Sequence, residues 1–229
     1  MIRFLIFLML PFVLFAQTKS QILSVSENEA VIKPVEAQKG MSGIVVHHYD
    51  ATHSTIVARA VYEGNGKVRF MIYDALKQDS LPKPKLTPKP GDEVILGYLY
   101  DRATIVAPDL LTFQAAQSKI DTNTQLLHPD LFLAELSKNK EPAPTKEDFK
   151  QFCNKYAVGV VYIVFDNTIH KTDCYTMQSL QSVKLSTSPQ KINTPFYSRI
   201  GKVETSIFNF FGSSEINDYN AYYRSLVVQ

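Results

Sequence analysis

The stretch that decides the fold of the carboxy-terminal half is residues 153–174, CNKYAVGVVYIVFDNTIHKTDC. Its apolar, β-branched run Val158–Phe165 predicts a strand, and Thr168–Thr172 predicts a second one. Asp166-Asn167 between the two runs has the composition of a tight turn. The segment therefore predicts a hairpin around which the rest of this half is arranged.

The sequence on both sides of this hairpin predicts helices and one further strand. Thr145 is placed to cap a helix that runs to about Tyr156, because Glu147 and Asp148 follow in the first turn, where the helix dipole favours negative charge. The other helices are expected at 110–119, 128–137 and 214–227, and a third strand at 182–185. The last helix would bury a stripe formed by Tyr219, Tyr222, Tyr223 and Leu226. Residues 109–229 thus predict a helical, three-strand α+β module.

Up to about residue 108 the pattern is one of short runs with period-two alternation. Gly64-Asn65-Gly66-Lys67 indicates a hairpin turn, because Gly and Asn tolerate positive φ. Strands are expected at 21–26, 30–34, 42–49, 55–63, 68–73, 93–100 and 103–107, the last two paired as a hairpin around Asp101-Arg102. Such strands favour a small barrel or curled sheet. The predicted fold class is α+β, with an antiparallel, barrel-like β-rich module at residues 17–108 followed by the α+β module.

Residues 1–16 have the pattern of a secretory signal peptide. Arg3 precedes the apolar run Phe4–Phe15, and Ala16 is a small residue ahead of polar sequence. The alternative is a membrane anchor, but this run is shorter than the roughly 17–25 residues that a spanning helix needs. No later run is long and apolar enough to span a membrane. We expect cleavage after Ala16 and a mature protein in the periplasm, at the outer membrane or on the cell surface.

Cys153 and Cys174 are the only two cysteines of the chain. In an exported protein such a pair indicates one disulfide. The bridge would close a loop of about 20 residues and stabilise the fold by about 3 kcal/mol on the chain-entropy model. The alternative is a pair of free or metal-binding thiols, although further cysteines or paired histidines at ligand spacing are lacking.

Charge and motifs argue against most kinds of chemistry. With 24 Lys and Arg against 22 Asp and Glu, the chain carries no charge excess that would suit nucleic acid. Three histidines cluster at His47, His48 and His53, but adjacent residues of a strand point to opposite faces, so a metal site would need His48, His53 and a carboxylate such as Asp50. No nucleophile elbow or phosphate-binding glycine loop occurs. We predict no enzyme, no catalytic residue, no cofactor and no metal.

A proline-rich stretch, LPKPKLTPKP at residues 81–90, is the clearest candidate for binding a partner. Alternating prolines forbid a helix and a central strand, so the stretch is expected to be extended. It would either present Lys83, Lys85 and Lys89 to an acidic partner or serve as a stiff, soluble connection between strands.

Several blocks of the sequence resemble a known family. Residues 153–164, with Asn167-Thr168 and Cys174, are similar to the amino-terminal domain family of the bacterial plasminogen-binding protein PgbA. Further similar blocks keep their order from about residue 35 to 227, namely residues 81–84, 89–92, 105–108, 194–199 and 220–223. The resemblance implies an export signal and a binding protein.

Long members of that family continue into a lysine-rich tail, and a terminal lysine offers a plasminogen kringle both an ammonium and a carboxylate. This chain resembles a member without the tail, since it stops at Gln229. The resemblance therefore implies weaker plasminogen binding, for which Lys138 and Lys140 would be internal substitutes.

Two functions remain as hypotheses. The first is an exported, non-enzymatic envelope protein that binds a protein partner in the periplasm or at the outer membrane. The alternative is a surface adhesin that binds host plasminogen.

Overall fold

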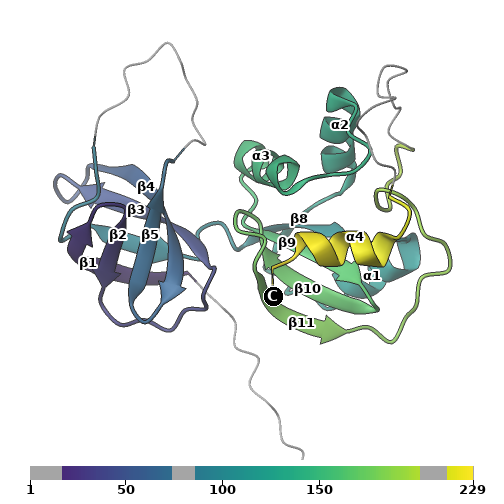
Figure 1. The fold of residues 1–229 in the computed structure, drawn as a ribbon, viewed down its shortest axis with the longest axis horizontal. Coiled ribbons are helices and arrows are strands. Elements are labelled where there is room, and N and C mark those ends of the chain that lie inside the picture. The colour runs from purple at the N-terminus through teal and green to yellow at the C-terminus, as the bar shows by residue number, and fades with distance from the viewer. Residues whose placement is uncertain (1–16, 74–85, 202–215, 229) are drawn as a thin grey trace, which may run out of the picture.

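The computed structural model describes residues 17–73, 86–201 and 216–228. The described chain forms two β-structures side by side, a barrel built from the amino-terminal residues and an open sheet accompanied by helices (Figure 1). The predicted mixed α+β fold with a β-rich amino-terminal module is confirmed. The expected signal peptide lies outside the described residues.

The barrel is closed and antiparallel, with strand order β1-β2-β5-β4-β3-β6 and β6 paired with β1. Two of its hairpins are those predicted, β1 with β2 and β4 with β5, and the second turns at Asn65 and Gly66, whose φ angles are 52° and 70°. Alternate residues such as Ala58, Ala60 and Tyr62 fill the interior. The strands are β1 Thr18–Ser26, β2 Glu29–Ile32, β3 Ser42–His48, β4 Ser54–Gly64, β5 Lys67–Met71 and β6 Glu93–Leu96.

The hairpin predicted around Asp101-Arg102 is wrong. β6 stays in the barrel between β1 and β3, whereas β7 (Arg102–Val106) joins the second sheet and runs parallel to its neighbours. Local pattern favours a hairpin wherever two apolar runs flank a short turn. The long apolar strand β9 (Val160–Phe165) offers β7 a partner with both faces buried, and this burial outweighs the local preference.

The second sheet has five strands, not the three predicted, in the order β11-β10-β9-β7-β8. Sequence pattern missed β8 (Gln125–Leu127) because it is only three residues long. β10 (Thr168–Asp173) pairs antiparallel with β9 through the predicted Asp166-Asn167 turn, and both turn residues have positive φ. The remaining elements are β11 Ser179–Lys184, α1 Leu110–Gln117, α2 Asp130–Asn139, α3 Lys146–Tyr156 and α4 Tyr219–Leu226.

Helices cover both faces of this sheet. On β9, Val161, Ile163 and Phe165 pack against a cluster that includes side chains of α2, α3 and α4. Val164 faces the opposite way and packs with Phe113 and Ala116 of α1. A strand covered on both faces is apolar throughout, which explains the continuous apolar run Val158–Phe165.

The helix ends follow their capping residues. Thr145 caps α3, as predicted, and it also forms a capping box with Asp148. The last helix is shorter than predicted, since Asp218 caps it and α4 begins at Tyr219; residues 214 and 215 lie outside the described part of the chain. Its stripe is confirmed, with Tyr219 and Tyr223 buried and Tyr222 and Leu226 packed against the same cluster.

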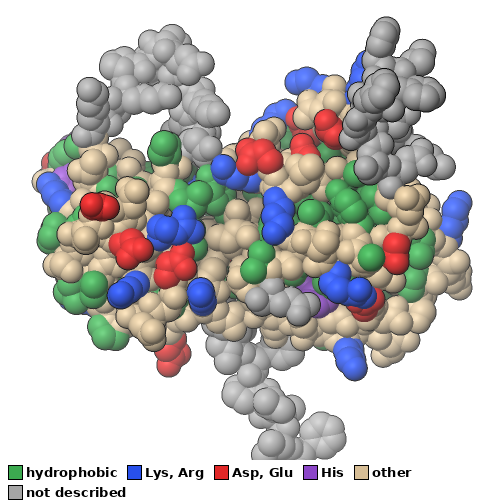
Figure 2. Space-filling model, in the orientation of Figure 1, with side chains coloured by type: hydrophobic (Ala, Val, Ile, Leu, Met, Phe, Trp, Pro, Cys, Tyr) green, Lys and Arg blue, Asp and Glu red, His purple; other side chains and the backbone are tan. Residues whose placement is uncertain are grey.

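Acidic and basic side chains are interspersed over the face shown in Figure 2, in keeping with the small net charge of the sequence. Within the three described ranges, no helix is long and apolar enough to cross a membrane.

Candidate functional site

A buried carboxylate joins the barrel to the second sheet. Asp173, at the end of β10, is fully buried. One of its oxygens, Oδ2, accepts hydrogen bonds from the backbone N–H (2.9 Å) and hydroxyl (2.7 Å) of Ser42 in the barrel and from the Tyr100 hydroxyl (2.6 Å). The other, Oδ1, accepts from the backbone of Tyr175 (2.9 Å) and from the backbone (2.8 Å) and hydroxyl (3.1 Å) of Thr176. A buried charge so fully hydrogen-bonded acts as a structural joint.

The same joint is reinforced by neighbouring groups. Burial, and then the adjacent Asp173 carboxylate, raise the pKa of Tyr100 well above its usual range, so its hydroxyl remains a donor at physiological pH. The Thr176 hydroxyl also donates to the carbonyl of Gly40 in the barrel at 2.8 Å. A Cβ added to Gly159 would lie 2.3 Å from the carbonyl oxygen of Leu99, so the backbone before β9 fits closely against the turn after β6.

The disulfide lies at this joint. Cys153 of α3 and Cys174, the residue after Asp173, are bonded, buried, and have Cα atoms 6.2 Å apart. The bridge ties the end of α3 to the loop that donates to Asp173. It therefore fixes the second-sheet side of the joint.

A cleft opens beside the disulfide, between the barrel and α3. The space within it, counted together with the solvent at its open mouth, is about 510 Å³. Its walls come from both modules, with Ser42, Arg59 and Tyr73 from the barrel side and Cys153, Asn154, Val158, Gly159 and Tyr175 from the other, together with Tyr98, Leu99 and Ala157.

Arg59 is the charged residue of this cleft. It is only 8% exposed, although it lies on the outer face of β4 between interior residues Ala58 and Ala60. Its Nη2 donates to Asn154 Oδ1 at 3.0 Å, and its guanidinium carbon lies 3.6 Å from the centre of the Tyr175 ring, a close cation–π contact. Among the described residues no carboxylate lies within ion-pair distance of it, and its Nε has no hydrogen-bond acceptor.

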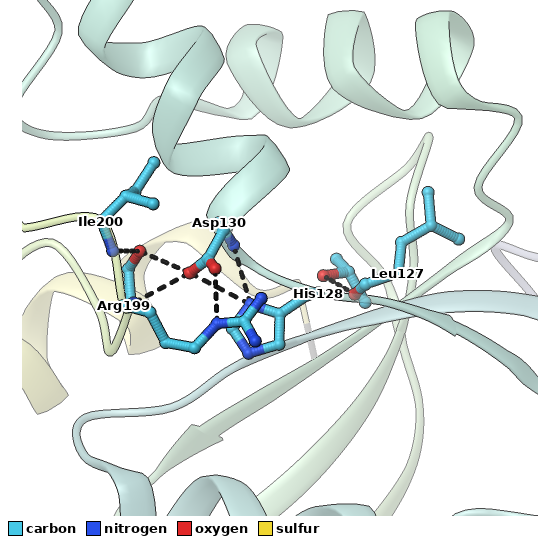
Figure 3. A network of polar contacts seen from close by, with 7 residues as sticks. Leu127, His128, Asp130, Arg199 and Ile200 are labelled. Atoms are coloured by element: carbon cyan, nitrogen blue, oxygen red, sulfur yellow. Dashed lines mark hydrogen bonds and ion pairs between the residues drawn. The ribbon is translucent and has the colours of Figure 1, made fainter.

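A second polar network lies away from the cleft, at the start of α2 (Figure 3). Asp130 accepts from Ser198 Oγ (2.7 Å), from the Arg199 backbone (2.9 Å) and from Arg199 Nε (2.7 Å). Burial raises the pKa of Asp130, but these hydrogen bonds outweigh burial and lower the pKa to about 2. The network ties the segment after residue 194 to α2 and is best explained as structural.

His128 belongs to the same network. Desolvation lowers its pKa against the opposing effect of the Asp130 carboxylate. Its Nδ1 accepts from the Asp130 backbone N–H at 3.2 Å, which requires that nitrogen to be unprotonated, and lies 3.0 Å from Asp130 Oδ1. The lowered pKa favours the neutral imidazole, and the backbone hydrogen bond assigns its proton to Nε2. The ring also packs against Phe113 and Tyr197.

Of the lysines proposed from sequence, Lys89 lies within the described residues, and it does not line the cleft. Lys83 and Lys85 lie outside the described residues. Lys89 is exposed in the turn before β6, where its backbone N–H donates to Asp92 Oδ2 at 2.9 Å. Their role as a partner-binding set stays a prediction. Lys138 and Lys140 are exposed at the end of α2.

The clustered histidines form separate pairs. His47 Nδ1 lies 2.7 Å from Asp92, His48 Nε2 lies 3.3 Å from Glu93, and His53 Nδ1 lies 2.8 Å from Asp50. Over residues 17–73, 86–201 and 216–228, no group of three or more His, Cys, Asp or Glu side chains could hold a metal ion.

Sequence analysis missed Arg59, Asp173 and Tyr100. One signal was available for Arg59, because a charged residue between alanines near the middle of a long strand is unusual. Its burial was not predictable, since the alternating pattern places it on the solvent face of the barrel. Asp173 stood next to a cysteine, but nothing in the local sequence showed that its partner was Ser42, 131 positions earlier.

Known proteins similar to this chain agree on one family. The family model described as plasminogen-binding protein PgbA N-terminal matches residues 17–227. Two proteins named plasminogen-binding protein PgbA, from Helicobacter pylori strains J99 and 26695, are 30% identical over 181 residues and 29% identical over 197 residues. These matches cover 78% and 84% of this chain but 39% and 43% of the relatives, so the chain spans less than half of their length. No solved structure matches the chain significantly.

The family match spans both sheets and the joint between them. The conclusion is that this chain belongs to the family of plasminogen-binding protein PgbA amino-terminal regions.

Proposed function

We propose that this protein is exported and acts as a non-enzymatic binding protein of the cell envelope, holding another protein against the surface that its two modules form together. The observation that carries the proposal is the buried Cys153–Cys174 bridge at the joint between the modules. Disulfides persist in oxidising compartments outside the cytoplasm. The signal pattern of residues 1–16 supports the same location.

A rigid joint suits a binding surface built from two modules. Preorganised surfaces lose less conformational entropy on binding than surfaces that must assemble first. Asp173 holds the barrel against the second sheet, the disulfide fixes the second-sheet side of this joint, and the walls of the cleft come from both modules. The names of the relatives also support a binding role.

Export and partner binding can be tested together in the native bacterium. A carboxy-terminally tagged chain is cross-linked in intact cells, the cells are fractionated, and the tagged species are sequenced from their amino termini. We expect a mature chain that begins at Gln17, carries no free thiol, and forms one reproducible cross-linked complex in the envelope fraction. A chain with an intact Met1 and two reactive thiols in the cytoplasm would contradict the proposal.

The second candidate partner is host plasminogen, which the names of the relatives favour. Capture would depend on lysines, and Lys83, Lys85 and Lys89 are the set to test. Plasminogen binding by the purified chain is measured with and without free lysine, alongside a variant with all three changed to Gln. A matched control changes Lys33, Lys39 and Lys67, which are exposed on the barrel.

If only the Lys83, Lys85 and Lys89 variant loses lysine-sensitive binding, these three lysines form the plasminogen-binding site. Equal binding by both variants would show that these lysines are not the site. No binding by the unchanged chain would show that plasminogen is not its partner.

A further inference from the structure

We propose that the cleft at the joint of the two modules is a carboxylate-binding site, in which Arg59 is the counter-ion of an acidic group presented by a partner protein. The inference rests on the proposed function only in taking the ligand to be part of a protein. The site itself follows from Arg59 and its surroundings.

A buried charge without a partner of opposite sign costs folding free energy. Burying a guanidinium removes its hydration, and proteins normally compensate with a carboxylate partner. Arg59 is 8% exposed, yet its described contacts are a single hydrogen bond to the neutral Asn154 and the faces of two tyrosine rings. Among the described residues, the guanidinium therefore has no anion within ion-pair distance.

The buried carboxylate of Asp173, whose partner Ser42 lines the cleft, is already fully hydrogen-bonded. Asp173 accepts six hydrogen bonds, none of them from Arg59. Ser42, which donates two of these, also lines the cleft, so the wall next to Arg59 presents groups turned toward Asp173. Asp173 therefore lends stability to the wall and leaves the positive charge of Arg59 to a ligand.

A second positive charge, that of Lys150, lies near the cleft. Lys150 of α3 lies 5.3 Å from the Tyr175 ring that Arg59 covers, so two cations flank one aromatic ring. Lys150 has a long contact of 3.7 Å with Glu147, whose side chain is 61% exposed, so this pair is well solvated. A single buried guanidinium with tyrosine walls suits a carboxylate on an apolar stem, whereas a phosphate dianion usually meets several cations or a cradle of backbone N–H groups.

The size of the cleft limits the ligand. About 510 Å³, some of it open to solvent, accommodates a side chain or a chain terminus rather than a folded domain. A glutamate or aspartate side chain and a terminal carboxylate share the required chemistry. The partner would therefore insert one acidic residue between the barrel and α3.

The test uses three short peptides with blocked amino termini, titrated into the purified chain. One carries a single internal glutamate and an amidated carboxyl terminus. The second has glutamine at that position and a free carboxyl terminus, and the third has glutamine and an amidated carboxyl terminus. The readouts are the ¹⁵N-edited NMR signal of the Arg59 Nε–H and the dissociation constant by calorimetry. We expect the signal to move with either carboxylate peptide and to stay in place with the neutral one. The tighter of the two acidic peptides identifies the source of the carboxylate.

Variants test the residue itself. Arg59→Met should weaken carboxylate binding by about tenfold to a hundredfold, as expected for the loss of a charged hydrogen bond. The affinity of Arg59→Lys for the carboxylate peptide should lie between those of the unchanged chain and Arg59→Met, because lysine keeps the charge but lacks the planar guanidinium. Arg69→Met is the matched control, since Arg69 lies exposed on the barrel and pairs with Glu63. It should bind like the unchanged chain.

Two results would overturn the inference. One is an Arg59 Nε–H signal that the neutral peptide moves as much as the acidic ones, and the other is tighter binding of inorganic phosphate than of either carboxylate peptide. The NMR readout needs no substitution, so the test remains decisive if Arg59→Met fails to fold. If the chain binds the carboxylate peptides but forms no complex in the envelope, the proposed function is rejected and the carboxylate site is kept. If the chain forms the complex but does not bind the carboxylate peptides, the site is rejected and the proposed function is kept.

Discussion

The barrel and the second sheet use the same short strands in opposite ways. Every pairing within the barrel is antiparallel, and three of these pairings, β1 with β2, β3 with β4 and β4 with β5, join strands that are neighbours in sequence. In the second sheet, β7 pairs in parallel with β8 and with β9, and β9 lies more than 50 residues further along the chain. The antiparallel half is held by local turns, whereas the other half depends on helices covering both faces and on a disulfide. Because the two halves are stabilised in different ways, we expect their stabilities to be coupled through the joint at which Asp173 contacts Ser42.

Removing the joint carboxylate should have the largest effect. Asp173→Ala leaves Ser42, Tyr100 and Thr176 hydroxyls and several backbone N–H groups without their buried acceptor. We expect a loss of unfolding free energy on the order of 4 kcal/mol. Amide NMR signals followed in urea should then show the barrel and the second sheet unfolding at different concentrations.

The control for that experiment is Asp101→Ala, an exposed aspartate in the turn before β7, which should change stability by less than about 0.5 kcal/mol. One cooperative transition of both halves in Asp173→Ala would show that the joint does not couple them.

Opening the disulfide should have the next largest effect. Replacing Cys153 and Cys174 together with Ser should cost roughly 2–5 kcal/mol, because the unfolded chain regains the freedom of the closed loop. The loss should fall on the second sheet and leave the barrel signals nearly unchanged. Urea unfolding of the variant, compared with the unchanged chain with and without reductant, measures it. Equal stability of all three samples would contradict the prediction.

Tyr100→Phe should have a smaller effect, about 1–2 kcal/mol, because it removes one donor to Asp173 and keeps the ring in place. Tyr98→Phe is the matched control. Tyr98 lies two residues earlier and is half-buried, and its hydroxyl makes no hydrogen bond to a described residue, so we expect almost no change. Thermal unfolding of the two variants side by side checks this, and an equal loss in both would refute the special position of Tyr100.

The smallest effect should come from Asp130 and depend on pH. Its folded pKa of about 2 lies below the ordinary value of 3.8, so the ionised carboxylate favours the folded state. That stability is present above about pH 4 and is lost as the pH falls toward 2. Asp130→Asn should therefore cost up to about 1 kcal/mol at pH 7, since Arg199 is largely exposed, and almost nothing near pH 2. Urea midpoints at both pH values measure it, and a cost that does not change with pH would contradict it.

Much of the fold could be predicted from the sequence because local signals carried it. The Asn65-Gly66 and Asp166-Asn167 turns need residues that tolerate positive φ, and Thr145 with Asp148 forms a capping box within one helical turn. The failures were non-local. The sequence placed β7 in a hairpin with β6 and missed the parallel ladder, because no local feature distinguishes a strand that pairs with its neighbour from one that pairs with β9.

The cleft was beyond sequence analysis for the same reason. The lysines were the sequence candidates for partner binding, and a metal site at the histidines was considered and not predicted. In the structure, each histidine of the 47–53 cluster has its own carboxylate partner. Arg59 appeared to be an ordinary exposed residue of an alternating strand. Its importance arises only when α3 and the loop after β10 cover the outside of the barrel.

By itself, the sequence determined the local turns, the helix caps and the alternation that fills the barrel, because each depends on residues within a few positions of one another. Only the tertiary structure decided which strand leaves the barrel, that Asp173 meets Ser42, and that Arg59 is buried with no carboxylate partner in the part of the chain that the structure describes. The physical reason is that burial of a charge depends on what packs over it, and here the two surfaces that meet come from opposite halves of the chain.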